Sequence, residues 1–94
     1  MPEEKMLNGL NVSAVESLIN DVKETPELAK SKFRASNEWM DGGHNRITVN
    51  GFYSAGQEIS HTKSFVLEAD EPPILAGKDQ AANPVEHLLN ALAT

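Results

Sequence analysis

The sequence predicts an α+β fold, in which an N-terminal helix precedes antiparallel β-strands and the start of a buried central helix. Two hydrophobic periods support this prediction. Apolar residues recur every three or four positions near the N-terminus, as on a helix face, and every second position from Lys32 onward, as in strands. A third observation is the segment Asn83-Pro84-Val85-Glu86, which combines several helix-start signals. The 94 residues suffice for one small domain.

The first helix is expected over residues 13–24. Its apolar residues lie at helical spacing and form one face: Val12, Val15, Leu18, Ile19 and Val22. Ser13 and Glu16 have the spacing of a capping box, in which each side chain accepts a hydrogen bond from a free backbone N–H. Proline disfavours helical geometry in the residue before it, so the helix is predicted to end at Thr25-Pro26. Residues 1–10 are interpreted as a flexible leader, and residues 11–94 as one partial domain.

Three strands are expected after the helix. Alternation from Lys32 to Trp39 predicts the first, with Trp39 packed in the core on the sheet face. Asp41-Gly42-Gly43 predicts a tight reversal into a second strand, and Gly51 in that strand is typical of a bulge or a close backbone approach. The third strand is expected over residues 64–69. It ends before Pro72-Pro73, because proline donates no backbone hydrogen bond to a sheet.

The last helix is predicted to begin at Asn83. Asparagine is a favoured N-cap, Pro84 suits the first helical position, and Glu86 places a negative charge near the positive helix end. Its apolar residues spread around the circumference, as in a helix surrounded by protein: Leu88, Leu89, Ala91, Leu92 and Ala93. One helix and three strands provide too little material to surround it. We therefore expect dimerisation to complete the fold.

The composition narrows the range of partners. A formal net charge of −6, with eight scattered lysines and arginines, argues against nucleic acid or an anionic membrane as the partner. The N-terminus lacks the basic and apolar run of a signal peptide, so a cytoplasmic location is expected. The three histidines, His44, His61 and His87, lie on separate predicted elements without metal-ligand spacing, and neither a metal nor a cofactor is predicted.

One pair of carboxylates has two interpretations. Asp70-Glu71 could be a paired-carboxylate acid/base site. Adjacent acidic residues before two prolines are more often a solvated turn, and this interpretation is preferred.

Two segments resemble the OsmC-like family (osmotically inducible protein C), which includes the organic hydroperoxide resistance proteins. The first runs from Glu68 to Asp79 and contains Pro72-Pro73 and Gly77-Lys78-Asp79. The second runs from Asn83 to Ala93. The segment from Trp39 to Arg46 resembles the first hairpin of one branch of that family. The resemblance covers about residues 32–94 and corresponds to the N-terminal half of the family's domain.

The resemblance implies a fold and a chemistry. OsmC-like proteins wrap an antiparallel sheet around a central helix and form an intimate homodimer. They act as peroxiredoxin-like enzymes in the oxidative stress response: a helix cysteine attacks an organic hydroperoxide, and a later cysteine resolves the sulfenic acid as a disulfide. Relatives place the first cysteine directly after the residues that match Leu92-Ala93-Thr94. Since this chain contains no cysteine, the resemblance implies a truncated protein that is inactive alone.

The resemblance also assigns supporting roles to two residues. Arg46 resembles the hairpin arginine that steadies the thiolate, and Glu86 resembles the glutamate that orients this arginine. The hydroperoxide-resistance relatives place these residues at the positions of His44 and Val85 instead. From local sequence alone, Glu86 reads as a helix-capping carboxylate and Arg46 as a cross-strand partner. These interpretations remain open at this point.

The sequence is also compatible with two other functions. The chain could be a non-catalytic interaction module that dimerises through its sheet edge and its apolar last helix. It could also be a binder of hydrophobic ligands that keeps the family's pocket without its thiols.

Overall fold

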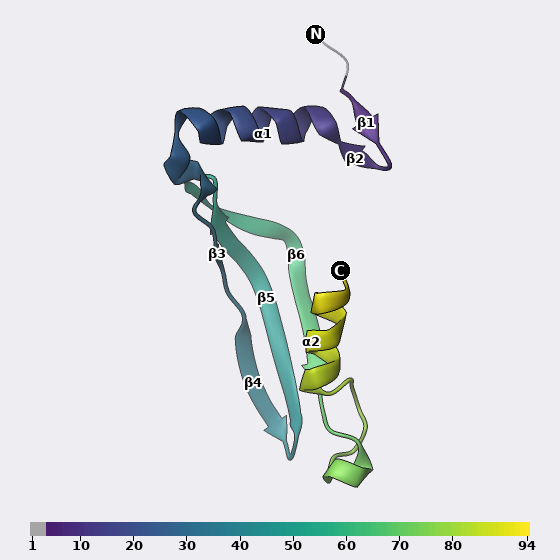
Figure 1. Ribbon diagram of the computed structural model, residues 1–94. Helices are drawn as coiled ribbons and strands as arrows, with labels where there is room; N and C mark the ends of the chain where they lie inside the picture. Colours follow the sequence, from purple (N-terminus) through teal and green to yellow (C-terminus); the bar gives the residue numbers. More distant parts are fainter. Residues whose placement is uncertain (1–3) are drawn as a thin grey trace. The chain divides into compact units, whose positions relative to one another are not determined.

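The computed structural model describes residues 4–94 and confirms an α+β fold with antiparallel strands (Figure 1). The helical elements are α1 (Val12–Glu24), η1 (Pro26–Ala29), η2 (Pro73–Leu75) and α2 (Pro84–Ala93). The strands are β1 (Met6–Leu7), β2 (Leu10–Asn11), β3 (Lys32–Phe33), β4 (Ser36–Asp41), β5 (His44–Ser54) and β6 (Gln57–Ala69).

The chain divides into two compact units. The N-terminal unit contains the residues up to Phe33 together with Phe52–Ile59, and the C-terminal unit contains Arg34–Gly51 and Ser60–Thr94. None of the helices in residues 4–94 has the length and the hydrophobicity that a membrane-spanning helix requires.

The central strand is β5, which hydrogen-bonds to β3, β4 and β6. The turn at Gly42-Gly43 joins β4 to β5, as predicted, and Gly42 has the positive φ of 56° that favours glycine. A second turn at Ala55-Gly56 leads into β6, which is much longer than the predicted third strand because it begins at Gln57.

Irregular pairing occurs at two places along β5. The register shifts between Trp39 and Asp41 of β4, near the turn. Between the pairs Phe33↔Phe52 and Ser36↔Thr48, residues 49–51 of β5 oppose only residues 34–35. The extra residue lies in the stretch that contains Gly51, where the sequence predicts a bulge.

The start of α1 corrects one prediction. The N-cap is Asn11, whose side chain accepts a hydrogen bond from the backbone N–H of Ala14 at 3.0 Å. The predicted capping box of Ser13 and Glu16 is wrong, because the Ser13 hydroxyl instead accepts from the backbone N–H of Lys5 at 2.8 Å. The helix begins at Val12, one residue earlier than expected, directly after the last residue of β2.

The pairing of β1 with β2 was missed within the segment interpreted as a leader, of which residues 1–3 lie outside the described range. Asn8-Gly9 joins the two strands with φ values of 50° and 80°. This dipeptide is a frequent hairpin signal, since both residues tolerate a positive φ. The signal was therefore present in the sequence.

Few side chains are buried in the single chain. Of the described residues, only Ala69 and Asp70 are buried. Trp39, predicted to pack in the core, is 67% exposed, and its indole N–H donates to the Gly42 carbonyl at 2.8 Å. The apolar residues of α2 are also exposed, by 57% to 74%: Val85, Leu88, Leu89 and Leu92. Burial of this helix was predicted, but in the single chain every residue of α2 except His87 is exposed.

Candidate functional site

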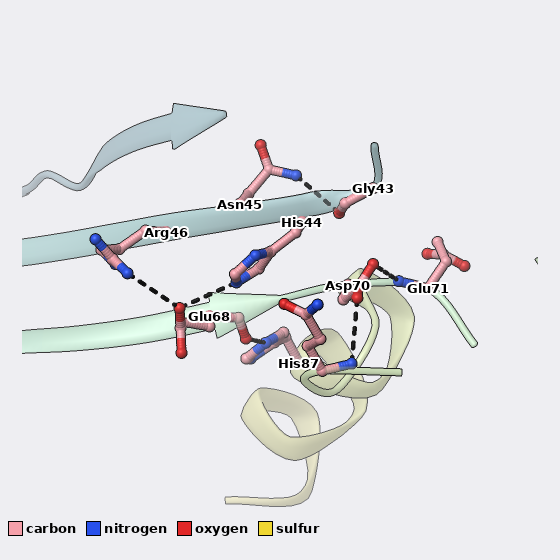
Figure 2. Close-up of polar contacts among 9 residues, drawn as sticks. Gly43, His44, Asn45, Arg46, Glu68, Asp70, Glu71 and His87 are labelled. Carbon is pink, nitrogen blue, oxygen red and sulfur yellow. Dashed lines mark hydrogen bonds and ion pairs between the residues drawn. The ribbon is translucent and has the colours of Figure 1, made fainter. Parts of the chain in front are cut away.

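The loop between β6 and α2, residues 70–83, is organised by the buried carboxylate of Asp70. This side chain is 1% exposed. It accepts hydrogen bonds from the backbone N–H groups of Glu71 at 2.7 Å and Gln80 at 3.1 Å (Figure 2). The backbone N–H of Asp70 donates to the Ala82 carbonyl at 3.2 Å. Asp70 thus holds both ends of the loop together.

These contacts determine the charge state of Asp70. Burial by itself raises the pKa of a carboxyl group. Here the hydrogen bonds from the backbone of Gln80, Glu71 and Lys78, with a smaller contribution from the charge of His44, outweigh that effect. The pKa of Asp70 is therefore lower than its ordinary value of 3.8, and the buried group is an anion at neutral pH.

Backbone hydrogen bonds within the loop bring Gly77 close to the backbone of Glu71. The Pro72 carbonyl accepts from the N–H groups of Leu75 at 2.8 Å and Gly77 at 3.0 Å, and the Glu71 carbonyl accepts from Asp79 at 3.0 Å. A Cβ atom at Gly77 would lie 1.8 Å from the carbonyl oxygen of Glu71 and 2.3 Å from its carbonyl carbon. Only glycine fits this position without a shift of the backbone.

An ion pair ties this loop to the β4–β5 hairpin. Lys78 Nζ lies 2.8 Å from Asp41 Oδ2. The hydrogen bond and charge of Lys78 lower the pKa of Asp41 below 3.8, and Asp41 in turn raises the pKa of Lys78 above 10.5. Both groups are largely exposed, so the pair contributes little to stability.

Three basic side chains contact Glu68, which lies near the end of β6 (Figure 2). Its carboxylate oxygen Oε1 lies 3.0 Å from His44 Nε2 and 3.5 Å from Arg46 Nη2. On α2, His87 Nε2 donates to the Glu68 backbone carbonyl at 2.8 Å. A carbonyl only accepts, so this bond requires a proton on Nε2 of His87. The contact fixes the first turn of α2 beside the strand.

The start of α2 has the predicted cap. The Asn83 side chain accepts from the backbone N–H of Glu86 at 2.8 Å, and the Glu86 carboxylate accepts from the backbone N–H of Asn83 at 3.0 Å. The two bonds form a capping box with Pro84 at the first helical position.

A pocket of about 350 Å³ lies between α2 and the sheet. Its apolar lining comes from Ile47, Leu67, Ala69 and Pro84, and its polar lining from Asn37, Asn45 and His87. A few polar groups in an apolar pocket are typical of sites for small organic ligands.

The two residues assigned by the resemblance have different partners. Arg46 pairs with Glu68, whereas Glu86 serves the helix cap. Side chains alternate along a strand, so His44 and Arg46 share one face of β5, and Asn45 and Ile47 share the other. Since Asn45 and Ile47 line the pocket, Arg46 lies on the opposite face of the sheet.

Sequence reasoning missed two residues of this site. The preferred interpretation of Asp70 as part of a solvated turn is wrong, because the loop folds back and encloses its carboxylate. Glu68 was placed in the third strand and at the start of the segment from Glu68 to Asp79, without a role in the site, and its partners lie about twenty residues away in the sequence. Spacing carries no signal for such contacts. Among residues 4–94, no cluster of histidine and acidic side chains has a geometry suited to a metal ion.

Comparison with known proteins leaves the family open. A scan against protein-family models found no match. A search of curated proteins also found none. Functional inference therefore depends on the site itself.

Proposed function

We propose that this chain is an OsmC-like protein of the oxidative stress response and that it contributes the loop, helix start and pocket of a site for organic hydroperoxides. The principal support is the way the Asp70 loop and the Asn83–Glu86 cap start an apolar helix above an apolar pocket. In this proposal the pocket between α2 and the sheet holds the alkyl part of the hydroperoxide. The 94 residues contain no cysteine, so the nucleophilic thiol is not among them.

The proposal includes a homodimer. The exposed apolar residues Val85, Leu88, Leu89 and Leu92 lie at spacings of three and four, so they share one face of α2. A second copy of the chain would remove this face from water. Arg46 and the pocket lie on opposite faces of the sheet, so a site that uses both requires a second copy to supply one of them.

The supporting residues acquire revised roles in this proposal. Arg46 supplies the positive charge that favours a thiolate, and Glu68, its partner, orients it. Glu86 stabilises the N-terminal end of α2 through the capping box. The protein is proposed to work in the cytoplasm, where thiols stay reduced.

A single added thiol tests this proposal. The chain itself should show no thiol-dependent turnover of cumene hydroperoxide. A cysteine appended after Thr94, at the C-terminal end of α2, should form a sulfenic acid with cumene hydroperoxide at least about ten-fold faster than the control Glu24→Cys, which places a thiol at the exposed last residue of α1. Trapping with dimedone followed by intact mass spectrometry measures both rates.

The same assay also tests the role of Arg46. Arg46→Gln should slow the reaction of the appended cysteine and leave that of the Glu24→Cys control unchanged. Equal reaction rates for the two thiols would contradict the proposed function.

A second candidate is a non-catalytic interaction module, which the exposed apolar face of α2 favours. The appended cysteine distinguishes the two candidates. A chain that dimerises while its thiol reacts no faster than the control would be an interaction module.

A further inference from the structure

A second pocket, of about 370 Å³, lies within the N-terminal unit. Its apolar wall is formed by Leu18, Ile19 and Val22 of α1 and by Leu28 of η1. The spacing of the three α1 residues places them on one helix face. Gly56, in the turn before β6, lies close enough to Leu28 that an added Cβ would be 3.2 Å from Leu28 Cδ2. This close packing holds Leu28 against the turn.

The apolar wall is open to solvent in the single chain. Leu18 is 51% exposed and Ile19 is 48% exposed. Covering such side chains is favourable, since each Å² of apolar surface removed from water contributes to binding. The volume of the pocket lies within the range of small-molecule sites.

The polar part of the lining is cationic and hydroxylic. Lys23 lines the pocket together with Ser31 and Ser54, whose hydroxyl oxygens lie 2.8 Å apart in a hydrogen bond. No acidic side chain is part of the lining. None of the ion pairs within residues 4–94 involves Lys23. In a chain of net charge −6, this pocket combines an apolar wall with a positive charge and two hydroxyl groups.

We propose that this pocket binds an aliphatic carboxylate of medium chain length, such as a fatty acid. The alkyl chain lies along Leu18, Ile19, Val22 and Leu28. The carboxylate accepts hydrogen bonds from Lys23 and from one of the two serine hydroxyls, and charge-assisted bonds of this kind are the stronger ones. This site does not depend on the proposed hydroperoxide chemistry, because none of its residues belongs to the pocket beneath α2.

Calorimetric titration of the 94-residue chain with decanoate, below its micelle concentration, tests the site. One decanoate should bind per chain. Lys23→Met should weaken binding about ten-fold or more, because it removes the charged partner. The matched control is Lys30→Met, which removes an exposed lysine at the end of η1 outside the pocket and should bind decanoate like the parent chain. Decanol, which has the same alkyl chain without the charge, should bind weakly and be insensitive to Lys23→Met.

A second variant addresses the apolar wall. Ile19→Glu places a negative charge beside the proposed alkyl chain and should abolish decanoate binding, while helix content by circular dichroism stays unchanged because Ile19 is half exposed. Amide NMR shifts caused by decanoate should occur in α1, η1 and the Ala55-Gly56 turn. The proposal would be overturned by non-saturable titration, by equal losses in Lys23→Met and Lys30→Met, or by shifts confined to the pocket beneath α2.

Discussion

Asp70 is the residue on which the geometry before α2 depends most. Its carboxylate is almost fully enclosed and accepts two backbone hydrogen bonds from positions one and ten residues further along the chain. A buried acceptor of this kind is favourable only while its donors remain in place. The same contacts lower its pKa, so the fold of the loop and the charge of Asp70 are coupled.

The first prediction concerns Asp70→Asn. An amide offers one acceptor oxygen where the carboxylate offers two, so one backbone N–H loses its partner. Urea unfolding at pH 7 should show a lower midpoint for Asp70→Asn than for the parent chain. Glu71→Gln is the matched control, because the backbone of Glu71 makes the loop's hydrogen bonds, and it should stay near the parent value.

The pH dependence of this effect has a defined sign. The folded state lowers the pKa of Asp70, so its contribution is complete above the ordinary value of 3.8 and is lost as the pH falls below that value. The difference between the parent chain and Asp70→Asn should therefore shrink in acid. A difference that persists well below pH 3.8 would show that the charge of Asp70 is not the cause.

A second prediction concerns Gly77→Ala. The added Cβ would overlap the backbone of Glu71, and relief of such overlap costs about 1–3 kcal/mol in packed sites. Gly43→Ala is the comparison variant with less overlap, because its Cβ would lie 3.3 Å from the Asp70 carboxylate. Denaturant unfolding should rank Gly77→Ala as clearly the less stable variant. The reverse order would contradict the described loop.

At the level of elements, the sequence predicted those features that depend on a few consecutive residues. The Asn83–Glu86 cap, the Gly42-Gly43 reversal and the end of β6 before Pro72-Pro73 were all predictable from the sequence. Two hairpins were predicted incompletely. The Asn8-Gly9 signal for the β1–β2 pair, which ends at the Asn11 cap of α1, was overlooked. β6 begins at Gln57, well before residues 64–69, over which the third strand was expected.

The cap of α2 provides the third prediction. Asn83→Ala removes an acceptor for the first turn and should destabilise the C-terminal unit by about 1 kcal/mol. Asn90→Ala, in the interior of the same helix, is the control. It should leave stability unchanged or raise it, since alanine has the higher helix propensity. Hydrogen exchange at the amides of residues 85–89 would measure both effects, and equal exchange in the two variants would contradict the role of the cap.

At the scale of the whole molecule, the sequence predicted the α+β class and an apolar α2. It contained no signal for the Asp70 loop or for the contacts of Glu68, because both depend on the approach of separate segments. The described residues leave the apolar face of α2 open to solvent. Apolar side chains gathered on one helix face are favourable to cover, and a second copy of the chain is the proposed cover.

Light scattering measures the mass of the chain in solution and thus tests whether a second copy covers α2. We expect a homogeneous dimer of the 10.2 kDa chain, which Leu88→Asp converts to monomer because it places a charge on the exposed face of α2. Glu86→Gln, on the same helix, should remain dimeric. A stable, folded monomer of the parent chain would contradict the proposed dimer, because the apolar face of α2 would then need no second copy.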